Sequence, residues 1–377
     1  MKKTKQVGFV GGGLNSAVGS AHFGALRMDR EFELVAGCFS RTTEINQETA
    51  HFYGVEEART YESINKMIDG EKGKLDALIL LTPTPAHFDH LKLCQDNGIP
   101  VICEKAMVCT SSQADEIVAA EKIHNGFLAM TYNYTGYPAL RELRHLIRDG
   151  QLGNLTHFIA EMPQEGFLRK RHDGSSIVPQ EWRLHDGQIP MVYLDLCVHL
   201  HQVTRYLIDE RPVKVSASQK TFGNFSEIVD WVSATVDYTS GIQGLFLFGK
   251  VMLGCRNGLN IRVFGTKGAA HWVQANPEEL RLAYDDGRIE ILDRGGAVKV
   301  ANKTRYTRFK AGHPVGFVEA FANLYRDIGN CLDSYHATKS WESDEVFGSS
   351  FVHSEMRFLE AMVDSASTGA SADVIFD

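Results

Sequence analysis

The sequence has no long apolar run. A helix that spans a membrane needs roughly 20 consecutive apolar residues, and no stretch of this chain approaches that length. The opening MKKTK resembles the charged start of a signal peptide, but an apolar segment of only about four residues follows before the glycines interrupt it. We therefore expect neither a membrane-spanning segment nor a secretory signal.

The sequence also lacks the cysteine spacing that is typical of zinc sites. Its 7 cysteines are odd in number, and no two are spaced C-x-x-C. Several lie inside apolar, strand-like runs, where cysteine behaves as a small hydrophobic residue. We expect no metal site and a reducing, cytoplasmic location.

Positive charge is scarce as well. The chain has 39 lysines and arginines against 47 aspartates and glutamates, which gives a net charge of −8. Nucleic-acid binding needs a basic surface that neutralises phosphates, so this balance argues against a nucleic-acid partner. The basic run FLRKRH at 167–172 is local, and we interpret it as a solvated loop.

What remains is the composition of a globular protein. The 377 residues are 44% hydrophobic and 23% charged, and the mean hydropathy is −0.19. This length exceeds one ordinary hydrophobic core, so we expect two domains.

The first 40 residues show the order strand, glycine turn, helix, strand. A strand is predicted at 5–10, a helix at about 15–28 and a second strand at 32–40, with Gly11-Gly12-Gly13 after the first strand. This order is typical of a βαβ unit that binds a dinucleotide.

The glycine turn predicts the cofactor loop. Gly11 permits the tight turn, and Gly13 lets the backbone approach a pyrophosphate at the helix N-terminus, where unpaired N–H groups attract anions. Leu14 and Asn15 continue the predicted loop. Ser16 stands where the fingerprint has its third glycine, so the match is imperfect.

The end of the second strand favours NADP over NAD. An acidic residue at this point normally holds the ribose 2′-hydroxyl of NAD. Here the strand ends in Phe39-Ser40-Arg41, and a hydroxyl with a guanidinium suits a 2′-phosphate better. The alternative is that Arg41 is a surface residue that opens the next helix.

Helices and strands continue to alternate up to residue 134. The expected helices are 61–70, 85–98 and 111–126, and the expected strands are 75–83, 100–105 and 127–134. Such alternation predicts a doubly wound parallel sheet, which binds ligands beyond the carboxyl ends of its strands. Thr82-Pro83 and Glu104-Lys105 lie at those ends and are candidate site residues. We assign residues 1–133 to this dinucleotide-binding domain.

After Pro138 the pattern changes. After a helix at 138–149, strand candidates alternate with turns rather than helices, which predicts a large, mostly antiparallel sheet. A last helix is predicted over 342–368. Residues 134–377 are therefore the expected α+β domain for substrate binding. An open sheet leaves one face for another copy, so we expect a dimer or tetramer.

One amphipathic helix in this half carries an acid and a histidine. Asp195 and His199 are spaced i and i+4, hence neighbours on one face of an α-helix. A carboxylate beside an imidazole fixes its tautomer and keeps a general base ready near neutral pH. The alternative is that His199 packs the helix and Asp195 caps it. His201 points elsewhere, and we interpret it as structural.

Several motifs together resemble one protein family. They are the glycine turn, Thr82-Pro83 with His87, Glu104-Lys105, Asp195 with His199, and the stretches 132–155, 261–272 and 311–325. In this set the chain resembles the glucose–fructose oxidoreductase, inositol dehydrogenase and MocA (Gfo/Idh/MocA) family over nearly its whole length. The resemblance implies a Rossmann-type domain followed by an α+β domain, and NAD(P)-dependent oxidation of sugars or cyclitols.

The resemblance also adds candidate site residues. It implies that Trp182 and Arg183 lie near the nicotinamide or the substrate. Tyr132 and Asn133, at a strand end, and His313, in the sequence AGHP, are candidates for substrate contact. Tyr132 suits a core position equally well, and a loop histidine is often a turn residue.

The chain departs from the family pattern at Ala106. The family has proline after the lysine, where a cis peptide is accessible, whereas a cis bond to alanine costs about 3–4 kcal/mol. Either this turn is trans, or the surrounding structure enforces the cis form. The direction in which Lys105 points depends on which of the two holds.

These features predict hydride transfer between a nicotinamide cofactor and a secondary alcohol of a sugar, sugar derivative or cyclitol. His199, oriented by Asp195, is expected to take the hydroxyl proton, and Lys105 to stabilise the oxygen. Glu104 is expected to pair with Lys105. The expected cofactor contacts are Gly11, Gly13, Leu14, Asn15, Ser16, Ser40, Arg41, Thr82, Pro83, His87, Glu104, Trp182 and Arg183. The expected substrate contacts are Lys105, Tyr132, Asn133, Asp195, His199 and His313.

Two other functions stay open from the sequence. One is a non-redox enzyme that keeps its cofactor bound and uses transient oxidation, as in glycoside cleavage or epimerisation. The other is a sensor that binds sugar or cofactor without catalysis. A sensor of this family usually loses the lysine or the histidine, and this chain has both.

Overall fold

The computed structural model describes residues 3–16 and 18–376. Packing divides the chain into two units, Met1–Gly136 with Gly316–His353, and Tyr137–Val315 with Ser354–Asp377. The first division, after Gly136, lies close to the boundary that the sequence predicts after residue 133. The later segment Gly316–His353 packs with the first unit, which the strand and helix pattern did not indicate.

The first unit contains a five-stranded parallel sheet. Its strands are β1 (Lys5–Gly11), β2 (Phe32–Cys38), β3 (Ala77–Leu81), β4 (Val101–Cys103) and β5 (Leu128–Met130). They pair in the order β2-β1-β3-β4-β5. The helices between the strands are α1 (Gly19–Asp29), α2 (Thr43–Tyr53), α3 (Ile64–Glu71), α4 (His87–Asp96) and α5 (Ser111–His124). The predicted doubly wound sheet is confirmed.

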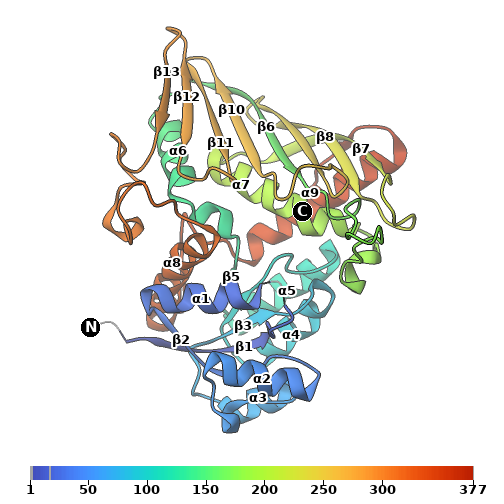
Figure 1. The fold of residues 1–377 in the computed structure, drawn as a ribbon, viewed down its shortest axis with the longest axis vertical. Helices are drawn as coiled ribbons and strands as arrows, with labels where there is room; N and C mark the ends of the chain where they lie inside the picture. The colour runs from blue at the N-terminus through green and yellow to red at the C-terminus, as the bar shows by residue number, and fades with distance from the viewer. Residues whose placement is uncertain (1–2, 17, 377) are drawn as a thin grey trace. The chain divides into compact units, whose positions relative to one another are not determined.

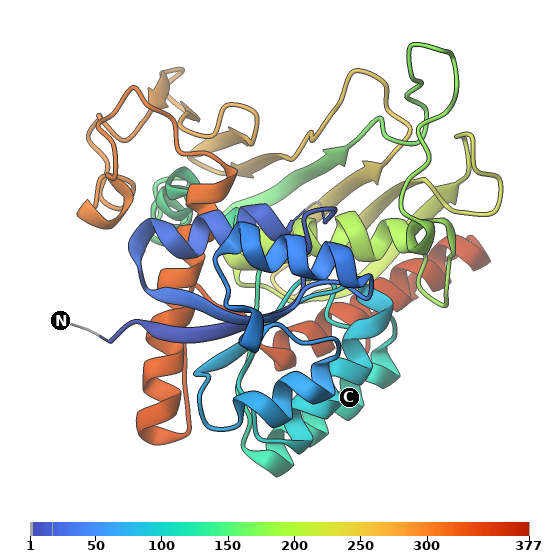
Figure 2. The ribbon, with the colours of Figure 1, turned by 60° about the horizontal axis from the view of Figure 1, so that its bottom comes forward.

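Helices cover both faces of this sheet. Successive side chains of a strand point to opposite faces, and β1 shows the consequence. Phe9 packs edge-on against Tyr53 of α2 on one face, whereas a Cβ at Gly8 would meet Met67 of α3 on the other. Figure 2 shows α1 and α2, in the darker blues, on one side of the strands and the lighter blue and cyan helices on the other.

A helix from the C-terminal part of the chain completes one of these layers. α8 (Phe317–Thr338) buries Phe321, Leu324 and Ile328 in the same hydrophobic core as α1. The ring of His22 on α1 lies 4.5 Å from the ring of Phe321. The cofactor-binding fold of this chain therefore includes residues that lie about 300 positions away in sequence, a separation at which no local pattern reports contact.

The second unit contains a nine-stranded sheet. Its strands are β6 (Leu155–Pro163), β7 (Pro212–Lys220), β8 (Trp231–Tyr238), β9 (Gln243–Gly249), β10 (Asn260–Gly265), β11 (Gly268–Val273), β12 (Leu280–Tyr284), β13 (Ile289–Leu292) and β14 (Ala372–Asp373). They pair in the order β13-β12-β11-β10-β6-β9-β8-β7-β14. Among the described strands of this second sheet, only the β6–β9 pair is parallel. The predicted mostly antiparallel sheet is confirmed.

Helices lie on one side of this second sheet. They are α6 (Pro138–Arg148), α7 (Val198–Ile208) and α9 (Ser349–Thr368), and Figure 1 shows α7 and α9 towards the lower ends of the strands. Phe246 of β9 packs against Phe358 of α9, with ring centroids 5.9 Å apart. Leu245, the residue before Phe246 on β9, is exposed. This alternation leaves the other face of the sheet open.

The last helix is shorter than the sequence predicts. α9 begins at Ser349, whereas the prediction began at 342. The hydroxyl of Ser343 accepts hydrogen bonds from the backbone N–H groups of Glu345 and Val346. A serine side chain that bonds nearby backbone in this way competes with helix formation, so the segment before α9 is a turn.

The described residues contain neither a membrane-spanning helix nor a cluster of metal-binding side chains. No helix among them is both long and apolar enough to cross a membrane. Within residues 3–16 and 18–376, no group of three or more histidine, cysteine, aspartate or glutamate side chains could hold a metal ion.

Candidate active site

The glycine loop after β1 makes the tight turn that the sequence predicts. The role of the third fingerprint glycine falls to Gly19 instead of residue 16. Gly11 and Gly12 have φ angles of 82° and 75°, which favour glycine. A Cβ at Gly19 would lie 2.1 Å from the carbonyl oxygen of Gly12. Gly19 therefore permits the close approach of helix and strand that the fingerprint normally gives to its third glycine.

The same contact explains where α1 begins. The helix was expected from about residue 15, and it begins at Gly19. Before it, Ser16 N donates to Gly13 O at 2.7 Å, and Ser16 Oγ accepts from Val18 N at 3.4 Å. Leu14 N donates to Thr49 Oγ1 of α2 at 3.1 Å, which ties the loop to the next helix. The predicted loop residues thus form a turn ahead of the helix.

A cavity lies beside the end of β2. It has a volume of about 260 Å³ and is lined by Ser40, Arg41, Thr43, Asn46, Gln47, Glu57, Thr60 and Glu62. Asn46 shapes it, because its side-chain oxygen accepts from the backbone N–H groups of Phe39 and Ser40 at 2.7 and 3.3 Å. Ser40 and Arg41, which the sequence proposed for the ribose end of the cofactor, therefore line this cavity.

His87 connects the loops that follow β3 and β4. Its ring is fully buried, with Nε2 2.7 Å from Thr82 O and Nδ1 2.8 Å from Ala106 O. Burial lowers the pKa of His87, and the two carbonyl groups offset only part of this effect. The peptide bond between Lys105 and Ala106 is cis. The structure places His87 as a bridge between the Thr82-Pro83 and Glu104-Lys105 segments.

Glu104 has partners that the sequence did not indicate. Its Oε1 lies 3.0 Å from Nε2 of His22 and accepts a hydrogen bond from Thr131 Oγ1. On the other side of the imidazole ring, His22 Nδ1 lies 2.6 Å from Tyr325 Oη. No motif marks His22 or Tyr325, because they lie 82 and 221 residues from Glu104 and meet it only in the folded chain.

Asp195 and His199 lie where the helix is irregular. Tyr193–Cys197 forms a π-helical turn, and α7 begins at Val198. Both side chains are buried, Asp195 at 8% and His199 at 6% exposure. The sequence predicted one regular amphipathic helix here. π-Helical turns of this kind occur frequently at functional sites.

Asp195 is held by two cations. Its Oδ2 lies 2.8 Å from Lys250 Nζ and 3.3 Å from Arg183 Nε. The guanidinium of Arg183 also stacks on the ring of Trp182 at 4.3 Å. Arg183 was expected near the cofactor, and the structure places it against Asp195 within the second unit.

Lys250 is the main residue of this unit that sequence reasoning missed. It follows β9 and begins a series of polar contacts: Lys250 Nζ to Gln164 Oε1 at 2.9 Å, Gln164 Nε2 to Asn257 Oδ1 at 3.0 Å, and Asn257 Nδ2 to Gln274 Oε1 at 3.2 Å. A polar residue just after an alternating strand was the only available signal. The antiparallel pairing brings these distant strand ends together with Asp195.

Tyr132 and Asn133 follow β5 in the first unit. Tyr132 is 1% exposed and packs edge-on against Phe347 and Phe351, which is the environment of a core residue. Asn133 is also buried, and within residues 3–16 and 18–376 its Nδ2 has no hydrogen-bond partner. An unpaired buried amide is costly, so Asn133 is the stronger candidate for ligand contact.

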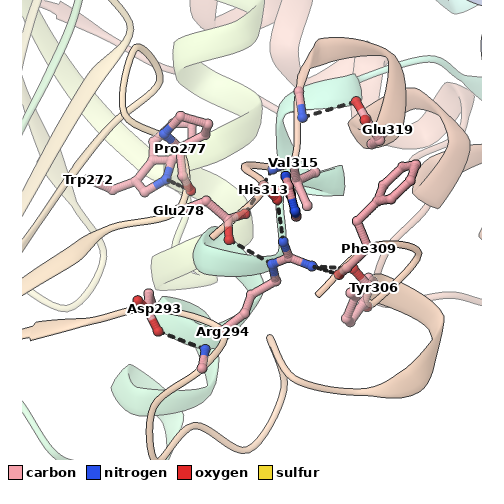
Figure 3. Close-up of polar contacts among 12 residues, drawn as sticks. Trp272, Pro277, Glu278, Asp293, Arg294, Tyr306, Phe309, His313, Val315 and Glu319 are labelled. Carbon is pink, nitrogen blue, oxygen red and sulfur yellow. Dashed lines mark hydrogen bonds and ion pairs between the residues drawn. The ribbon is translucent and has the colours of Figure 1, made fainter. Parts of the chain in front are cut away.

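His313 lies in an ordered loop that Arg294 organises. The buried guanidinium of Arg294 donates to the carbonyl oxygens of Tyr306, Phe309 and His313 and to the carboxylate of Glu278 (Figure 3). The imidazole of His313 is itself exposed. The structure thus fixes the backbone of His313 and leaves its side chain at the surface of the second unit.

Two family profiles match this chain. One, described as an oxidoreductase family with an NAD-binding Rossmann fold, matches residues 5–132. The other, described as a GFO/IDH/MocA C-terminal domain, matches residues 140–271. Together they cover most of both units.

Individual proteins are similar over much or all of the length. The uncharacterized oxidoreductase YfiI of Bacillus subtilis (strain 168) is 26% identical over 376 residues, 96% of this chain and 94% of YfiI. The scyllo-inositol 2-dehydrogenase (NADP(+)) IolW of that strain is 24% identical over 249 residues, 66% of this chain and 64% of IolW. An inositol dehydrogenase homolog from Azotobacter vinelandii, solved with NADH and myo-inositol, has the same fold, with a TM-score of 0.89, 24% identity and coverage of 99% of this chain and 98% of that one.

Fold, glycine loop and family profiles define an NAD(P)-dependent dehydrogenase. The chain belongs to the Gfo/Idh/MocA family of oxidoreductases. The residues present fit a dinucleotide, because the positive-φ glycines and the close contact of Gly19 with Gly12 bring the start of α1 to the end of β1.

Proposed function

We propose that this chain transfers a hydride between a nicotinamide cofactor and a secondary alcohol of a sugar, sugar derivative or cyclitol. The observation that carries the proposal is the buried Asp195, ion-paired with Lys250 and placed one turn before buried His199, in a chain with a dinucleotide-binding unit. The amides of Gln164, Asn257 and Gln274 support a polyhydroxylated substrate, because amides both donate to and accept from hydroxyl groups.

Each chemical role falls to a named side chain. His199 takes the hydroxyl proton as the alcohol is oxidised. Lys105 donates a hydrogen bond to the same oxygen and stabilises its developing negative charge. Asp195 orients His199 and contacts the substrate. The bound nicotinamide supplies the hydride chemistry, and the chain supplies placement and proton transfer.

Further contacts complete the proposed sites. Asn133 and His313 touch the substrate. Tyr132 supports the substrate contact of its neighbour Asn133 from within the core. The cofactor is held by the loop from Gly11 to Ser16, by Ser40 and Arg41, and by the segment Thr82-Pro83. Four further residues act next to the cofactor. Glu104 holds Lys105 in place, and His87 holds Thr82. Arg183, stacked on Trp182, holds Asp195.

The cofactor preference is for NADP. Ser40 and Arg41 line a cavity at the end of β2, and arginine can bind a 2′-phosphate through two hydrogen bonds. Glu57 and Glu62 also line this cavity, so a 2′-hydroxyl has possible partners as well.

The open face of the nine-stranded sheet supports a homo-oligomer. It exposes Leu245, Ile289 and Ile291, and an apolar sheet face of this kind commonly packs against a second copy. Light scattering on the purified chain measures the assembly directly, and a monomer at micromolar concentration would contradict this part of the proposal.

A cofactor-reduction screen tests the proposed function. Sugars, sugar acids and cyclitols are each incubated with NAD and with NADP, and absorbance at 340 nm is followed. Rising absorbance with at least one polyol supports the dehydrogenase. Product without any change in absorbance would instead indicate transient oxidation, and binding without product would indicate a sensor.

A further inference from the structure

A continuous chain of hydrogen bonds ends at the residue before Lys105. Tyr325 Oη lies 2.6 Å from His22 Nδ1, and His22 Nε2 lies 3.0 Å from Glu104 Oε1. Thr131 Oγ1 donates to the same carboxylate oxygen. All four residues are at most 6% exposed. The four groups therefore interact with one another in the interior of the first unit.

The four side chains come from four different elements. Tyr325 is on α8, His22 on α1, Glu104 follows β4, and Thr131 follows β5. α1 and α8 also pack through His22 and Phe321, whose rings lie 4.5 Å apart. One function of this chain of contacts is to join the two helices. Helix packing alone does not require a carboxylate at its end.

The hydrogen-bonding groups determine where the protons lie. An ionised carboxylate only accepts, so Nε2 of His22 carries the proton that it shares with Glu104. When the ring carries only this proton, its Nδ1 accepts from the Tyr325 hydroxyl. Burial, together with the nearby charge of Glu104, raises the pKa of Tyr325 well above its usual range, so this hydroxyl keeps its proton. Every donor in the chain therefore points towards Glu104.

This arrangement keeps a buried carboxylate charged. Burial raises the pKa of Glu104, but the hydrogen bond and the electrostatic attraction from His22, the charge of Lys105 and the hydrogen bond from Thr131 outweigh it, so the pKa lies below its ordinary value. The other titratable groups that act here are Cys103 on the same strand and His87 on α4. Without its donors, a buried carboxylate takes up a proton instead.

We propose that His22 is a positioning residue for the dehydrogenase reaction, because its hydrogen bond keeps Glu104 ionised and fixed next to Lys105, while Tyr325 holds the ring in the required tautomer. This inference rests on the proposed role of Lys105. It extends the functional machinery to α1 and α8, which carry no predicted catalytic motif.

The first test needs neither substrate nor cofactor. The carboxyl ¹³C resonance of Glu104, assigned by its absence in Glu104→Gln, is followed against pH in the full-length chain. In the unmodified chain the group titrates below 4.5, the ordinary value for glutamate. In His22→Phe the titration moves to higher pH. In His22→Gln, whose amide nitrogen can take the place of Nε2, most of the shift is reversed. An unchanged titration in His22→Phe would overturn the proposal.

The second test is a double-mutant cycle on turnover. We expect His22→Phe and Glu104→Gln each to lower kcat by about tenfold or more with little change in KM, since each removes a hydrogen bond to a charged group. The double variant should be no slower than Glu104→Gln, because His22 acts through Glu104. If His22→Phe slows the Glu104→Gln background by the same factor, the residue serves packing only and the proposal fails.

A matched control separates this role from a general loss of packing. His353 Nε2 lies 2.7 Å from Asp115 Oδ1 and joins two helices in the same unit, so His353→Phe should leave kcat unchanged. Tyr325→Phe is the milder variant if His22→Phe does not fold. We expect it to shift the titration of Glu104 to higher pH by a smaller amount. An unchanged titration of Glu104 in Tyr325→Phe would contradict the proposal. If the substrate screen finds no dehydrogenase activity, the titration of Glu104 still decides this inference.

Discussion

Lys250 and Asp195 form an ion pair in the second unit, with Nζ 2.8 Å from Oδ2. The Lys250 side chain is only 11% exposed, and its ammonium group also donates to Gln164. Arg183 binds the same carboxylate oxygen from a different segment. Asp195, which the sequence identified as the partner of His199 and as a substrate contact, is thus held in place by the residue after β9 and by a residue from the segment before α7.

Replacing Lys250 by methionine tests the value of this pair. We expect kcat to fall by about ten- to a hundredfold, because a hydrogen bond to a charged group is worth about 1.5–3 kcal/mol. Lys250→Arg should recover part of the loss. Lys220→Met, an exposed lysine at the end of β7, is the matched control and should stay within about twofold of the unmodified chain. Equal turnover in Lys250→Met would remove the residue from the site.

Lys105 and His199 are expected to affect chemistry rather than cofactor binding. Lys105→Met and His199→Asn should each lower kcat by about a hundredfold or more, the usual contribution of a general base or of a donor to a developing oxyanion. Fluorescence quenching on addition of the reduced cofactor should persist in both variants. Undiminished turnover in either one would contradict the role that we assign to it.

Gly19 should tolerate no side chain. In Gly19→Ala the new Cβ would lie 2.1 Å from the carbonyl oxygen of Gly12, so the start of α1 must move away from β1. We expect cofactor binding to be lost and stability to fall by about 1–3 kcal/mol, as for other overpacked sites. Gly24→Ala, on the same helix, meets only Val318 Cγ1 at 3.3 Å and is the control. Titration with cofactor and thermal unfolding compare the two variants.

Arg41 should decide between the two cofactors. Arg41→Ala is expected to lower the ratio of kcat/KM for NADP to that for NAD by about ten- to a hundredfold, since a charge-assisted hydrogen bond to phosphate is lost. Steady-state kinetics with both cofactors measure the ratio. An unchanged ratio would show that Arg41 is a surface residue, the alternative that the sequence left open.

His201 should make stability depend on pH. Burial and the nearby charge of Arg205 lower its pKa to about 3, and its ring stacks on Phe358 at 4.8 Å. An unfolded histidine titrates near 6.5. Above that pH both states are neutral, whereas below it only the unfolded state gains the proton. The free energy of unfolding should therefore fall by about 1.4 kcal/mol per pH unit from 6.5 towards 3 because of this residue.

His201→Phe should remove that contribution. Urea unfolding at pH 7.5 and 5.0 measures it, and the decrease between the two should be smaller in the variant. His157 stacks on Phe264 in the same unit but is exposed. His157→Phe is therefore the control, with the pH dependence of the unmodified chain expected. The same pH dependence in His201→Phe would show that the buried ring does not titrate as described.

Several parts of the fold followed from local patterns. The alternation of apolar strands and helices up to residue 134 predicted the parallel sheet, and the turn-separated strands after 150 predicted the antiparallel one. Gly11 was predicted to make the tight turn after β1, and its φ of 82° agrees. These features depend on residues within one or two elements of one another, so the spacing of apolar side chains and glycines is enough to indicate them.

Other features depended on contacts that spacing does not encode. Ser16 occupies the position of the third glycine in the dinucleotide-binding fingerprint. The loop between β1 and α1 is longer than the fingerprint spacing, so Gly19 rather than residue 16 approaches Gly12. The pairing of Glu104 was predicted with its neighbour Lys105, whereas the structure adds His22 and Thr131 from other elements. Lys250 was not singled out, because its only local feature is its place after a strand.

The sequence by itself determined the family, the two sheets and the segments that carry the chemistry, because those are set by periodicity, glycine positions and short motifs. Only the tertiary structure decided which polar groups share a buried environment. Tyr325 reaches His22 across 303 residues, and Lys250 reaches Asp195 across the turns of an antiparallel sheet. Burial and hydrogen bonding set the charge of such groups, and both are properties of the folded chain.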